Sequence, residues 1–363
     1  MVHLKFPTLR DDWSLDVVNI LAFLGEHNIL ATSQQICVSP FCFLPRLIPA
    51  PQGLLAQRPE TVPIDDGISI HNLSTEMRST GLSYFARMLH GTESSLPKYT
   101  VRVLEVKATT RESCHCPIRP RILSPFNILA VLSCALSVGL MSWAIVLEDL
   151  AAFVGILTMS MTTPLLCMGL KWSPSFLGLK VPPDRERTLL LWAPSGSITI
   201  VYCKQSVELM LYTFPHPPRY LVGSYSARGL GGIAGGITLV SSLVLYSNAT
   251  WTMKAALVVA YTVLNLLYWL AAILPPHWSW HLDFKVEEKE RIENQTFSSA
   301  LWSAMWATQR VDWALKNENI PDSALWRDWI EEAENCLHEP REKFDAQETL
   351  RRLMRSQESA FQK

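Results

Sequence analysis

Hydrophobic and polar residues are distributed very unevenly along this chain. Four long apolar runs without a charged residue lie at residues 126–147, 150–170, 229–246 and 255–274. A helix rises about 1.5 Å per residue, so about 20 residues cross a hydrocarbon core of about 30 Å. The pattern therefore predicts a mainly α fold, in which residues 121–276 form a four-helix transmembrane bundle.

The first two runs are predicted to form a helical hairpin. Glu148 and Asp149 separate them, and one continuous helix would bury both carboxylates at the middle of the bilayer. A turn at these two acids, exposed to water, avoids that cost. The third run is the shortest and is rich in glycine, and the fourth ends at Pro275 and Pro276.

Lysine and arginine in the connecting segments predict the orientation, because loops rich in these residues remain on the cytoplasmic side. They are frequent before the first run, between the second and third, and after the fourth, whereas the other two loops contain only Lys254. We therefore expect a multi-pass membrane protein with its N- and C-termini in the cytosol. The sequon Asn248-Ala249-Thr250 then lies on the opposite side, which makes Asn248 a glycosylation candidate. The organelle is not indicated.

Three cytosolic regions are expected around the bundle. Residues 1–120 mix short apolar runs with proline and serine, a composition that interrupts regular structure, and are expected to be partly disordered. The loop 171–228 is expected to contain a small β-hairpin, at 188–192 and 197–203, and a short helix at 205–212. Residues 277–363 are predicted to form a helical, tryptophan-rich C-terminal tail.

The tryptophans of the tail allow two interpretations. Trp302, Trp306 and Trp313 are spaced by four and seven residues, which places them on one face of a helix. A second apolar stripe runs from Leu325 to Leu337. These faces either pack against each other in a helical hairpin or lie among the lipid headgroups.

The composition agrees with a membrane protein and excludes one class of partner. Of the 363 residues, 48% are hydrophobic and 18% are charged, and the net charge is −1. Binding of nucleic acid needs a clustered basic surface, so no nucleic-acid partner is expected. The expected partners are the lipid bilayer and proteins that bind the cytosolic tail.

No group of residues predicts catalysis, a metal site or a cofactor. His277 and His281 are spaced as on one helix face, but the chain has nine scattered histidines, and an interfacial anchor is the preferred interpretation. Cys114 and Cys116 are too close together for a usual zinc pair. They are acylation candidates near a membrane span, with no special role as the alternative. We therefore expect no catalytic, cofactor-binding or metal-binding residues and no cofactor.

A glycine pattern in the third run has two interpretations. Residues 229–234 match the letters of a dinucleotide-binding turn, but no strand is predicted before them. The pairs Gly231 with Gly235 and Gly232 with Gly236 instead have the spacing of close helix packing in lipid. We expect these four glycines to pack against a neighbouring helix.

Three stretches resemble a known group of proteins. They are GSITIVYC, SNATWTMKAALVVAYTVLNLLYWLAAILPPHW and SALWSAMWATQRVDWALKNENIPDSALWRDWIEEA. Together, across about residues 120–337, they resemble a group of filamentous-fungal multi-pass integral membrane proteins without an assigned activity, some of them in secondary-metabolite gene clusters. The resemblance implies an accessory role in such a pathway and no catalytic residues.

The functional expectation is an accessory or scaffolding membrane protein that is not an enzyme. The alternative is a membrane-embedded biosynthetic enzyme that resembles a terpene cyclase, in which Glu148 and Asp149 would have to protonate the substrate. A small transporter is the third option. Ion paths and buried active sites in membranes usually contain ionisable residues, and the four apolar runs contain none.

Overall fold

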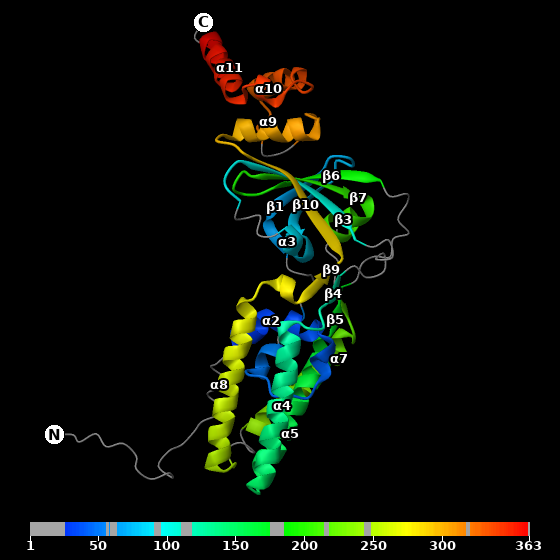
Figure 1. Cartoon of the computed structure of the whole chain (residues 1–363), viewed down its shortest axis with the longest axis vertical. Coiled ribbons are helices and arrows are strands. Elements are labelled where there is room, and N and C mark those ends of the chain that lie inside the picture. Colours follow the sequence, from blue (N-terminus) through cyan, green and yellow to red (C-terminus); the bar gives the residue numbers. More distant parts are fainter. Residues whose placement is uncertain are drawn as a thin grey trace, which may run out of the picture. The chain divides into compact units, whose positions relative to one another are not determined.

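The computed structural model describes residues 26–55, 58, 64–90, 96–109, 118–174, 185–213, 218–242, 248–316 and 320–361. The chain divides into two compact units, each assembled from three separated segments (Figure 1). We call them the helical unit (Met1–Glu60, Ile118–Ser175 and Pro217–His281) and the sheet unit (Thr61–Pro117, Phe176–His216 and Leu282–Lys363). The expected boundaries near residues 120 and 276 lie close to two of the changes between units, at 117/118 and 281/282, but residues 1–60 belong to the helical unit and residues 176–216 belong to the sheet unit.

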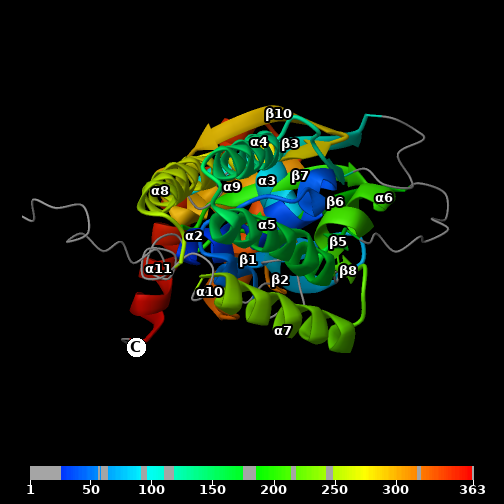
Figure 2. The ribbon, with the colours of Figure 1, turned by 90° about the horizontal axis from the view of Figure 1, so that it is seen from below.

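Three helices in the described residues are long and apolar enough to cross a membrane: α4 (Pro125–Val146), α5 (Leu150–Leu170) and α8 (Trp251–Ile273). They correspond to the first, second and fourth predicted runs. Helix α4 begins where the Ser124 side chain accepts a hydrogen bond from the Asn127 amide, with Pro125 in the first turn. Seen from below, α4 lies beside α8 (Figure 2).

The prediction of four full-length spans is wrong for the third run. Helix α7 (Ser224–Val240) has 17 residues, begins five residues before the predicted run and contains Arg228. It is therefore shorter than the about 20 residues that a helix needs to cross a bilayer. Residues 243–247, at the end of the predicted run, lie outside the described residues.

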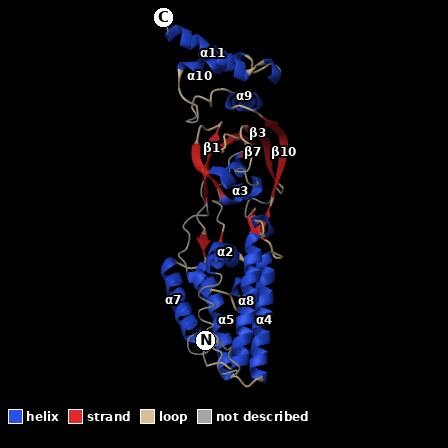
Figure 3. Ribbon diagram, turned by 90° about the vertical axis from the view of Figure 1, so that its left-hand side faces the viewer, coloured by secondary structure: helices blue, strands red, loops and turns tan. Residues whose placement is uncertain are grey.

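Part of the N-terminal region belongs to the helical unit, rather than to a separate cytosolic region as expected. Helix α2 (Glu26–Val38) is followed by the short 3₁₀ helices η2 (Pro40–Phe43) and η3 (Pro51–Leu55). Figure 3 shows α2 lying across one end of α4, α5 and α8. Two small sheets complete the unit, β4 (Ile118–Pro120) with β9 (Trp280–Leu282) and β5 (Trp172–Ser173) with β8 (Arg219–Tyr220).

The sheet unit contains a six-stranded mixed sheet in the order β10-β3-β7-β6-β1-β2. Its β3 and β7 strands are parallel and the other neighbours are antiparallel. The bounds are β1 (Ile64–Asn72), β2 (Arg78–Ser83), β3 (Thr100–Ala108), β6 (Glu186–Trp192), β7 (Ile198–Lys204) and β10 (Phe284–Glu293). The predicted hairpin is β6 and β7, and it lies at the centre of a larger sheet. Strands β1 and β3 come from the region expected to be partly disordered, and β10 from the tail expected to be helical.

Helices cover both faces of this sheet. One face is covered by α9 (Phe297–Thr308), α10 (Ala324–Asn335) and α11 (Ala346–Phe361) (Figure 1). The other face is covered by α3 (Tyr84–His90) and the short helix α6 (Gln205–Glu208). Helix α6 continues into a π-helical turn at Leu209–Thr213. The tryptophans of the tail are part of the core against the first face. Trp302, Trp313 and Trp329 are each 3% exposed or less.

The tail tryptophans are therefore packed inside the protein, but they form one core with sheet residues such as Val101 and Ile200 rather than the expected hairpin packing on itself. Their indole nitrogens also have partners inside the tail: Trp302 Nε1 donates to the Arg341 carbonyl at 3.0 Å and Trp329 Nε1 donates to the Ala346 carbonyl at 3.0 Å. Helix α9 ends at Thr308, so Trp313 reaches the core from the following turn and not from the same helix face.

Candidate functional site

A segment without regular structure is buried in the middle of the helical unit. Residues 44–50 connect η2 to η3, and Leu47, Ile48 and Ala50 are 2% exposed or less. Leu47 packs in a cluster with residues of α4, α5 and α8, among them Leu140 and Ile156. The sequence SPFCFLPRLIPAPQ, interrupted by prolines, therefore lies among the apolar helices rather than in a cytosolic region.

Small polar side chains of α4 and α5 satisfy the backbone of this segment. The Leu47 amide donates to Ser137 Oγ at 2.9 Å, and Ser133 Oγ donates to the Leu47 carbonyl. The Arg46 amide donates to the Ser160 carbonyl at 3.2 Å, and Thr163 Oγ1 donates to the Arg46 carbonyl at 2.7 Å. These partners lie near the middle of both helices, so the segment reaches the level of their centres.

The segment enters and leaves at the same end of α5. Before it, Lys171 Nζ donates to the carbonyls of Val38 and Ser39 at 2.9 and 2.8 Å. After it, Arg58 Nε donates to the Gly169 carbonyl at 2.9 Å. Between Gly169 and Ser160, α5 rises by about 13 Å at about 1.5 Å per residue. We call residues 39–55 the re-entrant segment.

The re-entrant segment carries a buried cation, Arg46, whose side chain is 1% exposed. Its Nη1 donates to the carbonyls of Phe41, Leu44 and Cys42 at 2.9, 3.2 and 3.4 Å. The hydroxyl of Tyr268 on α8 lies close enough to interact with the Arg46 guanidinium.

Buried thiols surround this cation. Cys42 and Cys167 lie close enough to interact electrostatically with Arg46, and Cys37 contacts Cys167. All three cysteines are buried and free of disulfides. The guanidinium of Arg46 holds three backbone carbonyls in and next to η2.

This cluster is the feature that sequence reasoning missed. An ionisable residue inside a membrane domain is by default a candidate functional residue, and the apolar runs contain none. Arg46 comes from outside those runs. The available signal was a single arginine within an apolar, proline-interrupted stretch at residues 39–52.

The acidic turn between α4 and α5 joins three helices. Asp149 Oδ1 accepts from the Ala152 amide at 2.9 Å, which caps α5, and Oδ2 accepts from the Thr250 amide at 2.7 Å, just before α8. Burial alone would raise the pKa of this carboxyl, but the amides of Ala152 and Thr250 outweigh it and lower the pKa. Glu148 is exposed and has a left-handed backbone, with φ 52°. The predicted turn is confirmed, but Asp149 is 7% exposed and is not in water as expected.

The structure places the other predicted site residues as follows. Asn248 is exposed, two residues before Thr250, and so lies near the acidic turn. Gly231 and Gly235 face the Leu55 side chain, at 3.7 and 3.6 Å from an added Cβ, and Gly232 and Gly236 face no described atom within 4 Å. The closest contact of α7 with α5 at a glycine is instead between Gly169 and Ala227. Cys114 and Cys116 lie outside the described residues.

The two histidines after α8 do not share a helix face. His277 lies in the 3₁₀ helix η7 (Pro276–Trp278), and His281 lies in β9. The neighbouring Trp280 is 1% exposed and packs against Trp172, with ring centroids 5.8 Å apart. Within the described ranges no group of three or more His, Cys, Asp or Glu side chains could hold a metal ion.

The sheet unit has two buried polar groups of its own. His90 on α3 hydrogen-bonds to the Tyr212 hydroxyl, and burial, together with the nearby Arg102, lowers its pKa to about 3. Glu208 accepts from Asn72 Nδ2 and lies 3.6 Å from Arg187 Nε. His90, Glu208 and Asn72 are each 5% exposed or less, so these groups stabilise the unit and are not accessible to a substrate.

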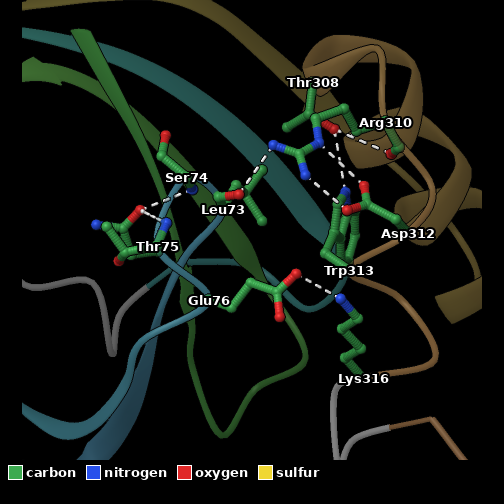
Figure 4. Close-up of polar contacts among 10 residues, drawn as sticks. Leu73, Ser74, Thr75, Glu76, Thr308, Arg310, Asp312, Trp313 and Lys316 are labelled. Carbon is green, nitrogen blue, oxygen red and sulfur yellow. Dashed lines mark hydrogen bonds and ion pairs between the residues drawn. The ribbon is translucent and has the colours of Figure 1, made fainter. Parts of the chain in front are cut away.

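The tail is fixed to the β1–β2 turn by charged contacts (Figure 4). Arg310 Nη1 donates to the Leu73 carbonyl at 2.8 Å, and its guanidinium pairs with Asp312. Lys316 pairs with Glu76, whose backbone is left-handed with φ 57°. These contacts join the end of β1 to the segment after α9.

No protein-family model, curated protein or solved structure matches this chain. The resemblance to fungal multi-pass membrane proteins therefore stays a prediction, and the functional argument depends on the geometry of this chain alone.

Proposed function

We propose that this chain is a multi-pass membrane protein that holds a folded cytosolic unit at the membrane and acts as an accessory scaffold, not as an enzyme. The observation that carries the proposal is the origin of the sheet strands. Strand β3 precedes α4, β7 lies between α5 and α7, and β10 follows α8. These three strands are direct neighbours in one sheet.

One folded sheet lies on one side of a membrane, because strands within lipid must close into a barrel. The chain must therefore cross an even number of times between β3 and β10. Helices α4, α5 and α8 supply three crossings, so a fourth crossing lies between α5 and α8. The segment that contains α7 is the only connection there.

Contacts at the two ends of α5 support this fourth crossing. The chain leaves the C-terminal end of α5 where the Leu221 amide donates to the Lys171 carbonyl at 2.8 Å. It arrives at the N-terminal end of α5 where the Thr250 amide donates to Asp149. Halfway, Ser241 hydrogen-bonds to Thr158 of α5 at 2.7 Å. We infer that the connection that contains α7 makes this crossing.

The distribution of lysine and arginine supports an orientation in which the sheet unit lies in the cytosol and the acidic turn, with Asn248, lies on the opposite side. The re-entrant segment enters from the cytosolic side and reaches about the middle of the bilayer. Non-helical backbone at that depth is tolerated where protein buries it, which agrees with the serine and threonine partners of Arg46 and Leu47.

The scaffolding role is supported by the surface of the tail. Helices α10 and α11 present exposed charged residues of both signs, among them Glu331 and Arg355. We propose that protein partners bind there, in a fungal biosynthetic pathway if the resemblance holds. The alternative, an enzyme that uses Glu148 and Asp149 as acids, is disfavoured because both Asp149 oxygens accept backbone amides.

One complementation experiment separates the two functions. A deletion strain receives either the Glu148→Gln/Asp149→Asn variant or the Glu331→Lys/Arg355→Glu variant, and its metabolites are profiled against those of the wild type. If the protein is a scaffold, the first variant, present at wild-type levels in the membrane fraction, should leave metabolite production unchanged. The second variant should reduce metabolite production. Reversal of the exposed Lys285 on β10 is the matched surface control. Loss of output from the first variant alone would contradict the proposal.

A further inference from the structure

A groove lies on the outer side of the helical unit between α4 and α8. Its volume is about 480 Å³, within the range of about 300–1,000 Å³ that is usual for ligand sites. Leu136, Leu140 and Trp143 of α4 form one wall, and residues 251–263 of α8 form the other. The side chains of α8 along the groove are small, because alanines lie at 255, 256 and 260.

The lining of the groove is almost entirely apolar. Thr252 is the one lining residue with a hydroxyl, and no lining side chain is charged. Trp143 and Trp251, which are 45% and 40% exposed, lie at the end of the groove nearest the acidic turn. Tryptophans are enriched at the boundary between lipid and water. The groove therefore begins near the non-cytosolic surface.

The length of the groove matches one leaflet. From Trp251 to Val263 the helix α8 rises by about 18 Å, at about 1.5 Å per residue. Half of a hydrocarbon core of about 30 Å is about 15 Å. The groove thus extends from the lipid–water boundary to the middle of the bilayer, parallel to the acyl chains of that leaflet.

We propose that this groove is a binding site for one acyl chain of a phospholipid in the non-cytosolic leaflet. The inference rests on the crossing by α4 and α8 and not on the scaffolding role. A phospholipid is the occupant favoured by the length of the groove, which matches one leaflet, and by the uncharged lining. The buried side of the groove is firm, because Leu140 and Ala260 pack with Leu47 of the re-entrant segment.

The site is tested by photolabelling of the full chain in lipid nanodiscs. Phosphatidylcholine with a diazirine at the middle of one acyl chain serves as the probe, and labelled residues are mapped by mass spectrometry. Val259 and Val263 in the groove and Val138 on another face of α4 are 62%, 46% and 52% exposed. If the groove holds an acyl chain, labelling at Val259 and Val263 should be at least fivefold higher than at Val138.

Substitution variants give a second measurement. Ala255→Phe fills the groove and is expected to reduce its labelling at least threefold, whereas Val138→Phe, the matched control, leaves groove labelling unchanged. Equal labelling of Val138 and the groove valines in the wild type would overturn the proposal and show ordinary solvation by lipid. Displacement of the acyl probe by a photoreactive sterol would also overturn it, because the occupant would then be a sterol. Absence of labelling at all these positions would instead contradict the membrane crossing itself.

Discussion

Replacement of Asp149 with alanine is expected to destabilise the helical unit by about 3 kcal/mol. The substitution removes the N-cap of α5, for which losses are typically about 1 kcal/mol. It also removes the acceptor for the Thr250 amide, and hydrogen bonds to charged groups contribute about 1.5–3 kcal/mol. Asp149 is 7% exposed, so water does not readily replace either interaction.

The free energy of unfolding can be measured by titrating SDS into detergent micelles that contain the full chain and following helix content by circular dichroism. Asp149→Asn keeps one acceptor oxygen and is expected to lose about half as much as the alanine variant. Glu148→Gln is the matched control, because Glu148 is exposed at the neighbouring position, and a change below about 0.5 kcal/mol is expected there.

The pH dependence gives an independent check. The pKa of Asp149 is lowered in the folded chain, so its contribution is fully present above the unfolded pKa of about 3.9 and is lost as the pH falls through the folded value. The difference between wild type and Asp149→Ala should therefore shrink below about pH 4. Equal stability of Asp149→Ala and Glu148→Gln at pH 7 would refute the reasoning.

Three further predictions concern buried groups. Arg46→Met leaves the carbonyls of Phe41, Cys42 and Leu44 without their donor. It should lower the free energy of unfolding by about 3 kcal/mol in the same SDS titration, whereas Arg46→Lys, which keeps three donors, should lower it less. Equal losses for the two variants would contradict the role of the cation. The pKa of His90 is lowered to about 3 in the folded chain, so this histidine is protonated in the unfolded chain first as the pH falls below about 6.5. The free energy of unfolding of the sheet unit should therefore fall by about 2 kcal/mol between pH 7 and 5. Chemical denaturation followed by tryptophan fluorescence measures this loss, and His90→Gln should remove it. Trp329→Phe removes the hydrogen bond to the Ala346 carbonyl and should lower the free energy of unfolding by about 1 kcal/mol. The loss should appear as faster proteolysis of the tail. Trp278→Phe, at a half-exposed position, is the control.

Residue periodicity predicted the elements that depend on local pattern. The three spans, the β6–β7 hairpin and the acidic turn each follow from apolar runs, β-branched residues or a break in hydropathy within one short stretch. The tryptophan stripes predicted tail helices that pack against each other. They did not predict the sheet core that the tryptophans join, which includes Val101, Leu190 and Ile200 from distant segments.

The elements that were missed depend on partners far away in the chain. Strand β10 (FKVEEKERIE) has only Phe284 and Ile292 buried, so its sequence lacks the alternation of a half-buried strand, and it is a strand because β3 pairs with it. The re-entrant segment has polar backbone groups that bond to Ser133, Ser137 and Thr163, which lie on helices far away in the chain. The third run was overestimated because an uncharged run does not define where its helix begins.

The most direct test of the proposed topology compares the two sides of the membrane in sealed vesicles. Single cysteines are placed at Asn248 and at the exposed Glu331 in a chain whose other cysteines are replaced by serine or alanine. A maleimide that cannot cross membranes then labels each from the cytosolic face. An even number of crossings between β3 and β10 predicts labelling of position 331 and protection of position 248 until detergent is added. Labelling of both positions from the cytosolic face would contradict the account.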